Sequence, residues 1–268
     1  MAFWHLFLLA ALQGVTEFLP VSSSGHLVLL PALTGLEDQG LFLDVAVHVG
    51  TLAAVILYFR ADVALALRGC GALLRGQREG EAPRLALGLI LATLPVIAAG
   101  FALHLSGLDV LLRSVAVIGW ATIVFGLLLW WADRRGAHAL ALPDWGPGRA
   151  LVLGLWQAVA LIPGTSRSGI CITGARLMGF TRHEAARVAM LMSIPTIAAS
   201  GILLGLDVAD DPAAADRLRE GLIAAGLACA AALVALALMM RLLRSVSFTP
   251  YVIYRLLLGA GLLIWAYS

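Results

Sequence analysis

Charged residues are scarce in this sequence. They make up 13% of the 268 residues, whereas hydrophobic residues make up 61% and the mean hydropathy is +0.96. Soluble domains carry about 25% charged residues. The composition therefore excludes an ordinary soluble domain and predicts a polytopic membrane protein, and the net charge of +2 gives no indication of nucleic-acid binding.

Cysteines are also few. Cys70, Cys171 and Cys229 are far apart, which gives neither a disulfide framework nor a metal-binding pattern. The N-terminal segment lacks the basic stretch that opens a cleavable signal peptide, so we expect residues 1–11 to be retained.

Long apolar stretches are what the sequence has in abundance. A helix needs roughly 20 mostly apolar residues to cross a bilayer. Six stretches meet this requirement and are predicted to span the membrane: about 41–59, 85–104, 111–131, 186–206, 221–240 and 251–267.

Two further apolar regions are interrupted. Residues 3–33 are broken by Pro20 and a run of serines, and residues 150–180 are broken by Pro163 and Gly164. Pro20 is expected to end the first half-helix, because proline cannot continue a helix, and the serines that follow are good N-caps. Broken helices occur at membrane depth only inside protein or around a cavity, so both regions are predicted to be re-entrant hairpins.

The loops indicate the orientation. Arginines gather in the connections at 60–84, 132–149 and 241–250, which the positive-inside rule assigns to the cytoplasm. The connections between them are short or acidic and are expected outside, as are both termini. Their acidic residues are Glu37, Asp38, Asp109, Asp207, Asp210, Asp211 and Asp216.

Internal similarity accompanies this topology. Residues 13–20 (QGVTEFLP) resemble residues 157–163 (QAVALIP) with one residue deleted, and Ser-Gly recurs at 24–25 and 168–169. With opposite sides of entry and three spans after each broken segment, this pattern is typical of an inverted repeat.

The predicted fold is therefore an all-α polytopic membrane protein. It has six transmembrane helices plus two re-entrant helical hairpins in an inverted repeat. Residues 1–268 form a single integral membrane domain, with one repeat at about 1–131 and the other at about 150–268.

Polar residues concentrate at the two breaks. Glu17, Ser22–Ser24 and His26 lie at the first break, and Thr165–Ser168, including Arg167, lie at the second. Ionisable residues at membrane depth are costly and by default indicate a functional site. Helix N-termini and arginine both bind phosphate, so the two breaks are predicted to meet and hold the phosphate of a lipid head group.

The residue types also indicate chemistry. Glu17 is suited to hold a divalent metal or to act as a base, and His26 is suited to proton transfer. A serine hydroxyl beside His26 is a candidate nucleophile. Direct attack by an activated water is an equal alternative at this point.

Residues 14–26 and 163–169 together closely resemble the bacterial undecaprenyl-diphosphatases of the bacitracin-resistance type. The resemblance extends from end to end of the chain. It implies hydrolysis of undecaprenyl diphosphate to undecaprenyl phosphate and inorganic phosphate, which recycles the lipid carrier for peptidoglycan synthesis and confers bacitracin resistance. It further implies a divalent cation, Mg or Ca, and a multi-pass location in the bacterial inner membrane with the active site open to the periplasmic side.

The resemblance also implies residue roles. The implied catalytic residues are Glu17, Ser23, His26 and Arg167, with Ser23 as nucleophile in a covalent route, His26 as its base or as acid to the leaving group, and Glu17 as metal ligand. The implied substrate-binding residues are Gln13, Ser22, Ser24, Thr165, Ser166 and Ser168. One position departs from many members, which carry a second glutamate where this chain has Gln13. Gln13 lies four residues before Glu17 and shares its helix face. A two-carboxylate metal site would therefore lack one of its carboxylates here, which leaves Glu17 as the only carboxylate of the motif.

Other functions remain as alternatives. A transporter or flippase of a phosphorylated polyprenyl lipid would use the same repeat and the same phosphate site, but it has less need of adjacent Glu, Ser and His residues. An anion channel fits the crowded, aliphatic site less well. Asp44 and His48 share a face near the outer end of a span, where they line the entrance or simply pair. A homodimer is left open, and no nucleic-acid partner is expected.

Overall fold

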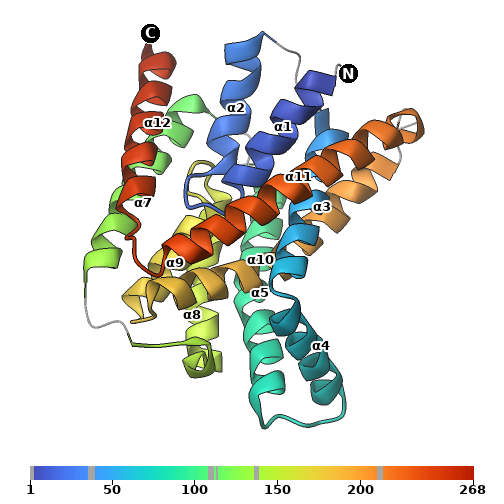
Figure 1. Cartoon of the computed structure of the whole chain (residues 1–268), viewed down its shortest axis with the longest axis vertical. Coiled ribbons are helices and arrows are strands. Elements are labelled where there is room, and N and C mark those ends of the chain that lie inside the picture. Colours follow the sequence, from blue (N-terminus) through green and yellow to red (C-terminus); the bar gives the residue numbers. More distant parts are fainter. Residues whose placement is uncertain (1–2, 36–39, 108–111, 113, 136–138, 210–213) are drawn as a thin grey trace.

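The structure is a computed structural model that describes residues 3–35, 40–107, 112, 114–135, 139–209 and 214–268. Within these ranges the chain is helical, with one isolated bridge between Leu140 and Phe180 and no strand (Figure 1). Both termini lie at the same end of the molecule, as the predicted topology requires.

Six helices of the described chain are long and apolar enough to cross a membrane. They coincide with the six predicted spans, so the protein is an all-α polytopic membrane protein. Their bounds are α3 (Gly40–Tyr58), α5 (Glu81–Ser106), α7 (Val115–Arg134), α10 (Arg182–Ala209), α11 (Ala214–Leu242) and α12 (Thr249–Tyr267).

The two interrupted regions are pairs of short helices joined by turns. The first consists of α1 (Phe3–Thr16) and α2 (Ser23–Thr34). The second consists of α8 (Pro147–Ala158), the 3-10 helix η2 (Val159–Leu161) and α9 (Arg167–Leu177). A further 3-10 helix, η1 (Leu142–Asp144), precedes α8.

The first break begins earlier than predicted. The helix α1 ends at Thr16, four residues before Pro20. The ring of a proline clashes with the carbonyl group four residues before it, so Pro20 stops the helix at Thr16 rather than at its own position. Residues 17–21 form the turn, which leaves Glu17 just beyond the helix end.

Two expectations about loops were wrong, and a third concerns residues outside the described part of the chain. Residues 60–84 were expected to be a loop, but α4 (Arg60–Leu74) is a helix packed against α5, because its alanines, leucines and arginines are good helix formers. The acidic stretch at 207–220 was also expected to be a loop, yet the backbone of α10 continues to Ala209 and α11 starts at Ala214. The remaining predicted outer acidic residues, Glu37, Asp38, Asp109, Asp210 and Asp211, lie outside the described residues.

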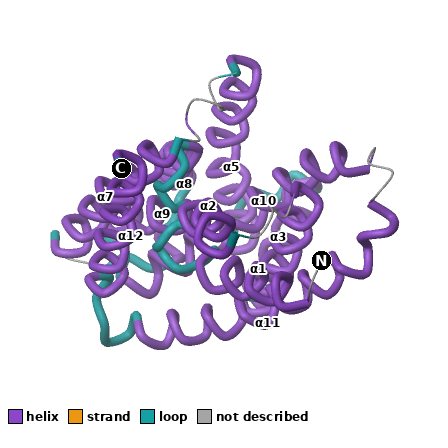
Figure 2. Tube along the Cα trace, turned by 90° about the horizontal axis from the view of Figure 1, so that it is seen from above, coloured by secondary structure: helices purple, strands orange, loops and turns teal. Residues whose placement is uncertain are grey.

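The broken helices pack against the long ones in a matching way. The helix α1 packs along α11, α8 packs along α5, and α7 packs along α12. In the view along the long axis, α2 and α9 lie near the middle, with α5, α7, α11 and α12 around them (Figure 2). If α1 corresponds to α8 and α11 corresponds to α5, the contact of α1 with α11 is equivalent to the contact of α8 with α5, as two similar halves would give.

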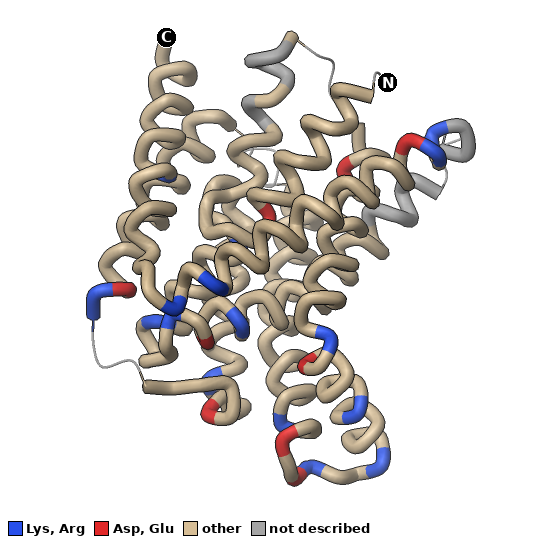
Figure 3. Tube along the Cα trace, viewed as in Figure 1, with Lys and Arg blue, Asp and Glu red and all other residues tan. Residues whose placement is uncertain are grey.

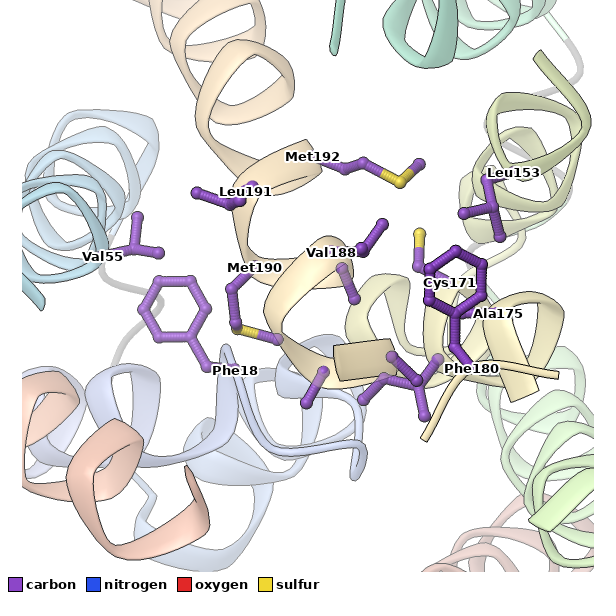
Figure 4. Packing of buried hydrophobic residues seen from close by; sticks show 14 of the residues in the cluster. Phe18, Val55, Leu153, Cys171, Ala175, Phe180, Val188, Met190, Leu191 and Met192 are labelled. Carbon is purple, nitrogen blue, oxygen red and sulfur yellow. The ribbon is translucent and has the colours of Figure 1, made fainter. Parts of the chain in front are cut away.

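A buried aromatic residue holds the first turn in place. Phe18 is fully buried and lies between Val55 of α3 and Met190 of α10 (Figure 4). Inside an apolar membrane protein such a side chain stabilises the structure by close packing rather than by removal from water. This packing fixes the backbone beside Glu17, the neighbouring residue in the turn.

Charged residues are concentrated at one end of the molecule. Figure 3 shows many of the arginines on α4, in the connection from α4 to α5 and where α7, α10 and α11 begin or end on the side away from the termini, with a smaller charged group at the start of α11. We refer to this side as the arginine-rich end.

We predict that Gly50→Ala destabilises the fold, because α3 and α11 touch at this glycine. A Cβ atom at Gly50 would lie 2.1 Å from the backbone oxygen of Ala225, which has no room to move away. The expected loss is about 1–3 kcal/mol, measured as a lower thermal midpoint in detergent. Gly226→Ala in α11 is the matched control, since nothing lies within 4 Å of its added Cβ. Equal losses in both variants would contradict the close approach.

Candidate active site

The two turns meet at the middle of the molecule and are joined by reciprocal serine contacts. The Ser24 hydroxyl of the first segment accepts a hydrogen bond from the backbone N–H of Gly164 at 3.2 Å. The Ser168 hydroxyl of the second segment donates to the backbone oxygen of Leu19 at 3.0 Å. The predicted meeting of the two breaks is therefore present in the structure.

Each turn contains one strained serine. Ser22 and Ser166 have φ angles of 73° and 69°, and among the described residues they are the only non-glycine residues with positive φ. Each precedes a helix, α2 or α9, and each hydroxyl contacts the hydroxyl two residues later: Ser22 with Ser24 at 3.0 Å and Ser166 with Ser168 at 3.1 Å. Such conformations cost about 1–3 kcal/mol each and cluster at functional sites.

A glycine allows the second turn to approach α7 closely. Gly164 has a φ of 89°, and a Cβ atom there would lie 2.3 Å from the backbone oxygen of Ile118. The Thr122 hydroxyl donates to that oxygen at 2.7 Å and lies 3.2 Å from the Gly164 oxygen. The turn is thus fixed directly against the backbone of α7.

Glu17 is the centre of the polar site. Its carboxylate accepts hydrogen bonds from Gln13 Nε2 and Ser23 Oγ, both at 2.9 Å. Arg167 of the second segment forms an ion pair with it through Nη2. The Glu17 side chain is only 8% exposed, so this charge is both buried and fully engaged, as a carboxylate at membrane depth must be.

Arg167 has a second partner and faces a cavity. Its Nη1 donates to the backbone oxygen of Ser193 at 3.1 Å, which fixes the plane of the guanidinium. A cavity of about 360 Å³ is lined by Glu17, Arg167, Asp44 and His48, together with Thr196, Ser200 and apolar residues. His48 Nε2 lies 3.8 Å from the Glu17 carboxylate. Asp44 and His48 therefore line the same cavity as Glu17, and His48 Nδ1 also lies 2.7 Å from the Asp44 backbone oxygen, so both roles considered from sequence stay open.

His26 has different partners from those predicted. Its Nδ1 is 2.7 Å from the backbone oxygen of Ser22, and its Nε2 is 2.6 Å from the hydroxyl of Tyr254. Since a carbonyl only accepts, Nδ1 carries a proton and donates to it. In the neutral ring Nε2 accepts from the Tyr254 hydroxyl, and in the protonated ring Nε2 donates to it. The predicted Ser23–His26 pair is absent from this structure, because the Ser22 carbonyl and Tyr254 engage both ring nitrogens while Ser23 donates to Glu17.

Sequence reasoning missed two residues of α12. One is Tyr254, and the other is Arg255, which is fully buried and has no carboxylate partner in the described chain. The Arg255 guanidinium donates to the backbone oxygens of Gly164 (3.1 Å) and Thr165 (2.9 Å) in the second turn, and of Pro20 (3.4 Å) in the first. Its Nε donates to the Thr122 oxygen of α7 at 3.0 Å. The available signal was an arginine inside a predicted span, which by default indicates function.

Two buried polar atoms of predicted site residues have no hydrogen-bond partner. They are Oε1 of Gln13 and the hydroxyl oxygen of Thr165. No cluster of three or more His, Cys, Asp or Glu residues suited to a metal occurs among the described residues. Magnesium is commonly bound by one or two carboxylates plus substrate phosphates. Glu17, Asp44 and the unpartnered Gln13 oxygen fit that kind of site, in which the substrate completes the ligand set.

The arrangement is chemically suited to an anion with a transferable group. Arg167 and the N-termini of α2 and α9 supply positive charge and amide donors. The Ser23 hydroxyl donates a hydrogen bond to the Glu17 carboxylate. A nucleophile and its general base are arranged in this way. Fold and site together define a polytopic membrane protein with a buried polar centre between two broken helices.

The chain belongs to the BacA family, described as bacitracin resistance protein BacA, whose pattern matches residues 6–261. Curated relatives named undecaprenyl-diphosphatase are similar over the whole length. The relative from Ruegeria pomeroyi is 65% identical over 270 residues, and that from Dinoroseobacter shibae is 61% identical over 270 residues, with all of both chains covered in each case. The relative from Hahella chejuensis is 45% identical over 271 residues, covering 100% of this chain and 99% of its own.

We predict that Arg255→Leu destabilises the protein by about 3 kcal/mol or more, because several buried carbonyls lose their donor and each costs about 1–3 kcal/mol. The measurement is the thermal midpoint of the purified protein in detergent. Arg68→Leu is the control, since the Arg68 side chain is exposed and bonds only to its own helix. A midpoint for Arg255→Leu within the range of the control would contradict the role given to Arg255.

Proposed function

We propose that this protein hydrolyses undecaprenyl diphosphate to undecaprenyl phosphate and inorganic phosphate in the bacterial inner membrane. The reaction recycles the lipid carrier for peptidoglycan synthesis and confers bacitracin resistance. The family and the full-length relatives support this function. The observation that carries it is the ion pair of Glu17 with Arg167, which brings base, nucleophile and cation together from segments 150 residues apart.

The diphosphate would bind at the cavity beside Arg167. A planar guanidinium matches phosphate oxygens, and the first amides of α9 have no acceptor within their own helix. Thr165, Ser166 and Ser168 in this turn, with Gln13, Ser22 and Ser24 in the first, form the polar surroundings that would orient the substrate. The prenyl chain would remain in the apolar phase.

The geometry favours Glu17 rather than His26 as the base for Ser23. In the covalent route, Ser23 Oγ attacks the terminal phosphorus, its proton passes to Glu17, and the bond from that phosphorus to the bridging oxygen breaks. Undecaprenyl phosphate leaves with the bridging oxygen. Water then hydrolyses the phosphoserine and yields inorganic phosphate. In the direct route, water replaces Ser23 as the attacking group, and Glu17 accepts its proton.

His26 and Tyr254 would act next to this centre. The hydrogen bond from Tyr254 keeps the proton of His26 on Nδ1 and leaves Nε2 as an acceptor. To donate to the leaving phosphate, the second of its two predicted roles, His26 would first take up a proton on Nε2, and the phosphate oxygen would then replace Tyr254 as the partner of that nitrogen. Its contacts place it one turn of α2 beyond Ser23.

A divalent cation, Mg or Ca, is part of the proposal. Glu17, Asp44 and the Gln13 oxygen would hold it together with the diphosphate. Such an ion neutralises phosphate charge and polarises the phosphoryl group. Because Gln13 is neutral, Asp44 would supply the second carboxylate that many members have at position 13.

The proposal also includes the membrane arrangement. The α1–α2 and α8–α9 pairs would enter from opposite faces as re-entrant hairpins of an inverted repeat, with repeats at about 1–131 and 150–268. The matching packing of α1 on α11 and α8 on α5 supports this arrangement. With the arginine-rich end in the cytoplasm, the site would open to the periplasmic side. A homodimer stays a prediction.

We predict that Arg167→Ala lowers the rate of phosphate release from undecaprenyl diphosphate by about a hundred-fold or more, because a preorganised cation at the reacting phosphate is lost. The measurement uses purified protein in detergent with magnesium, with calcium and with chelator, and wild-type release is expected to need the metal. Arg75→Ala is the control, since Arg75 is exposed and bonds to its own helix.

The same assay separates the enzyme from a carrier. Folded wild-type protein that binds the lipid without releasing phosphate would contradict the enzyme and favour the transporter or flippase. Equal activity of Arg167→Ala and Arg75→Ala would contradict the site.

We predict that Ser23→Ala abolishes a covalent intermediate, because its hydroxyl is the one that donates to Glu17. Acid quenching of wild-type protein during turnover, followed by peptide mass spectrometry, should show a phosphorylated Ser23. Ser24→Ala is the matched control, since its hydroxyl contacts Gly164 instead. Substantial turnover by Ser23→Ala, with no phosphopeptide in the wild type, would establish direct attack by water.

A further inference from the structure

A second polar cavity lies at the arginine-rich end, far from the serines of the two turns. It has a volume of about 460 Å³ and lies where α7, α9 and α11 end and α10 begins. We call it the inner basic cavity. Its charged or titratable lining residues are Asp133, Arg134, Arg176, Arg182, His183 and Arg244.

The single carboxylate of this cavity is already fully used. Asp133 is buried, and Arg182 Nε donates to its Oδ1 and Oδ2 at 2.8 and 3.1 Å. Arg176 Nε lies 3.0 Å from Oδ1 as an ion-pair neighbour without hydrogen-bond geometry. Asp133 also accepts the backbone N–H of Phe248 at 3.3 Å. A carboxylate offers about four lone-pair sites, so Asp133 has little capacity left for another arginine.

The cavity therefore has an excess of positive charge. Four guanidinium groups face one carboxylate, which leaves a formal surplus of three positive charges with His183 neutral. The neighbouring Glu184 does not line the cavity, and its carboxylate pairs with Arg187 at 3.4 Å and contacts His183 at 3.0 Å. Arg134 and Arg244 have no ion pair within the described parts of the chain, and both are exposed.

The residue types match phosphate in particular. The chain contains no lysine, so the side-chain cations that line this cavity are arginines. A guanidinium presents a planar fork of donors, whereas a lysine ammonium is a point charge. At the start of α10, Thr181 already accepts from the amides of Glu184 and Ala185, so the phosphate donors of this cavity are the guanidinium groups. Arg176 is anchored by donating to the Phe180 and Asp133 backbone oxygens, so one wall of the cavity is rigid.

The position of the cavity points to a lipid as the source of the phosphate. Arg134 lies over the ring of Trp130 at 4.3 Å, and its neighbour Arg135 lies over Trp131 at 4.5 Å. Both tryptophans are partly exposed on α7, as expected for residues at the membrane interface. Basic pockets between transmembrane helices on the cytoplasmic side bind the head groups of anionic lipids.

We propose that the inner basic cavity binds the phosphate of an anionic phospholipid of the cytoplasmic leaflet, such as the phosphate pair of cardiolipin. The bound phosphate contacts Arg134, Arg182 and Arg244 and leaves the pair of Asp133 with Arg176 in place. The cavity is a structural lipid site, separate from the cavity of Glu17 and Arg167.

The test is a titration of cardiolipin into purified protein in detergent, with the bound fraction followed by native mass spectrometry. The double variant Arg134→Gln, Arg244→Gln should bind cardiolipin at least about tenfold more weakly than wild type. The matched control is Arg75→Gln, Arg78→Gln, which removes two exposed arginines of the same end from outside the cavity. Neither pair bonds to Asp133, so both variants keep the internal ion pairs.

Three outcomes decide the proposal. Loss of cardiolipin binding in the cavity variant alone supports it. An equal loss in the control would show general attraction to the arginine-rich end and overturn it. Inorganic phosphate, added at constant ionic strength, is the third arm: if it raises the thermal midpoint of wild type as much as cardiolipin does, the site takes a free anion and the lipid assignment is overturned.

Discussion

Broken backbone in the middle of an apolar protein has to be satisfied by the protein itself, and this constraint organises the structure. In lipid, carbonyls and amides outside a helix find no water. The guanidinium of Arg255 meets much of this need, because it donates to carbonyls of both turns and of α7. Ser24 and Ser168 add the reciprocal bonds between the turns. One buried cation thus holds together the segments that carry the site.

The interactions that assemble the site are the same ones that would perform its chemistry. Glu17 accepts hydrogen bonds from Gln13 and Ser23 and pairs with Arg167. A substrate phosphate would compete with Glu17 for Arg167 and so release the carboxylate for proton transfer. The strained backbone at Ser22 and Ser166 is accompanied in each turn by a hydroxyl contact with the serine two residues later, and such strain clusters at functional sites. Stability and catalysis are therefore coupled at these residues.

Much of the fold could be predicted, because the thickness of a bilayer sets the length of a spanning helix. The six spans and the two breaks followed from apolar length and from Pro20 and Pro163. The helix α4 did not, since the arginines between residues 60 and 84 were interpreted as the mark of a cytoplasmic loop. The close approaches at Gly50 and Gly164 were also invisible, because the sequence does not show which helix lies opposite a glycine.

The sequence by itself determined which residues are candidates for the chemistry, since ionisable and hydroxyl side chains stand out where the surroundings are apolar. Only the tertiary structure decided their partners. Ser23 bonds to Glu17, whereas His26 bonds to Tyr254, which lies 228 residues further along the chain. The physical reason is that the cost of a polar group in an apolar segment is local and readable from composition. The hydrogen bonds that offset the cost depend on helices brought together by packing.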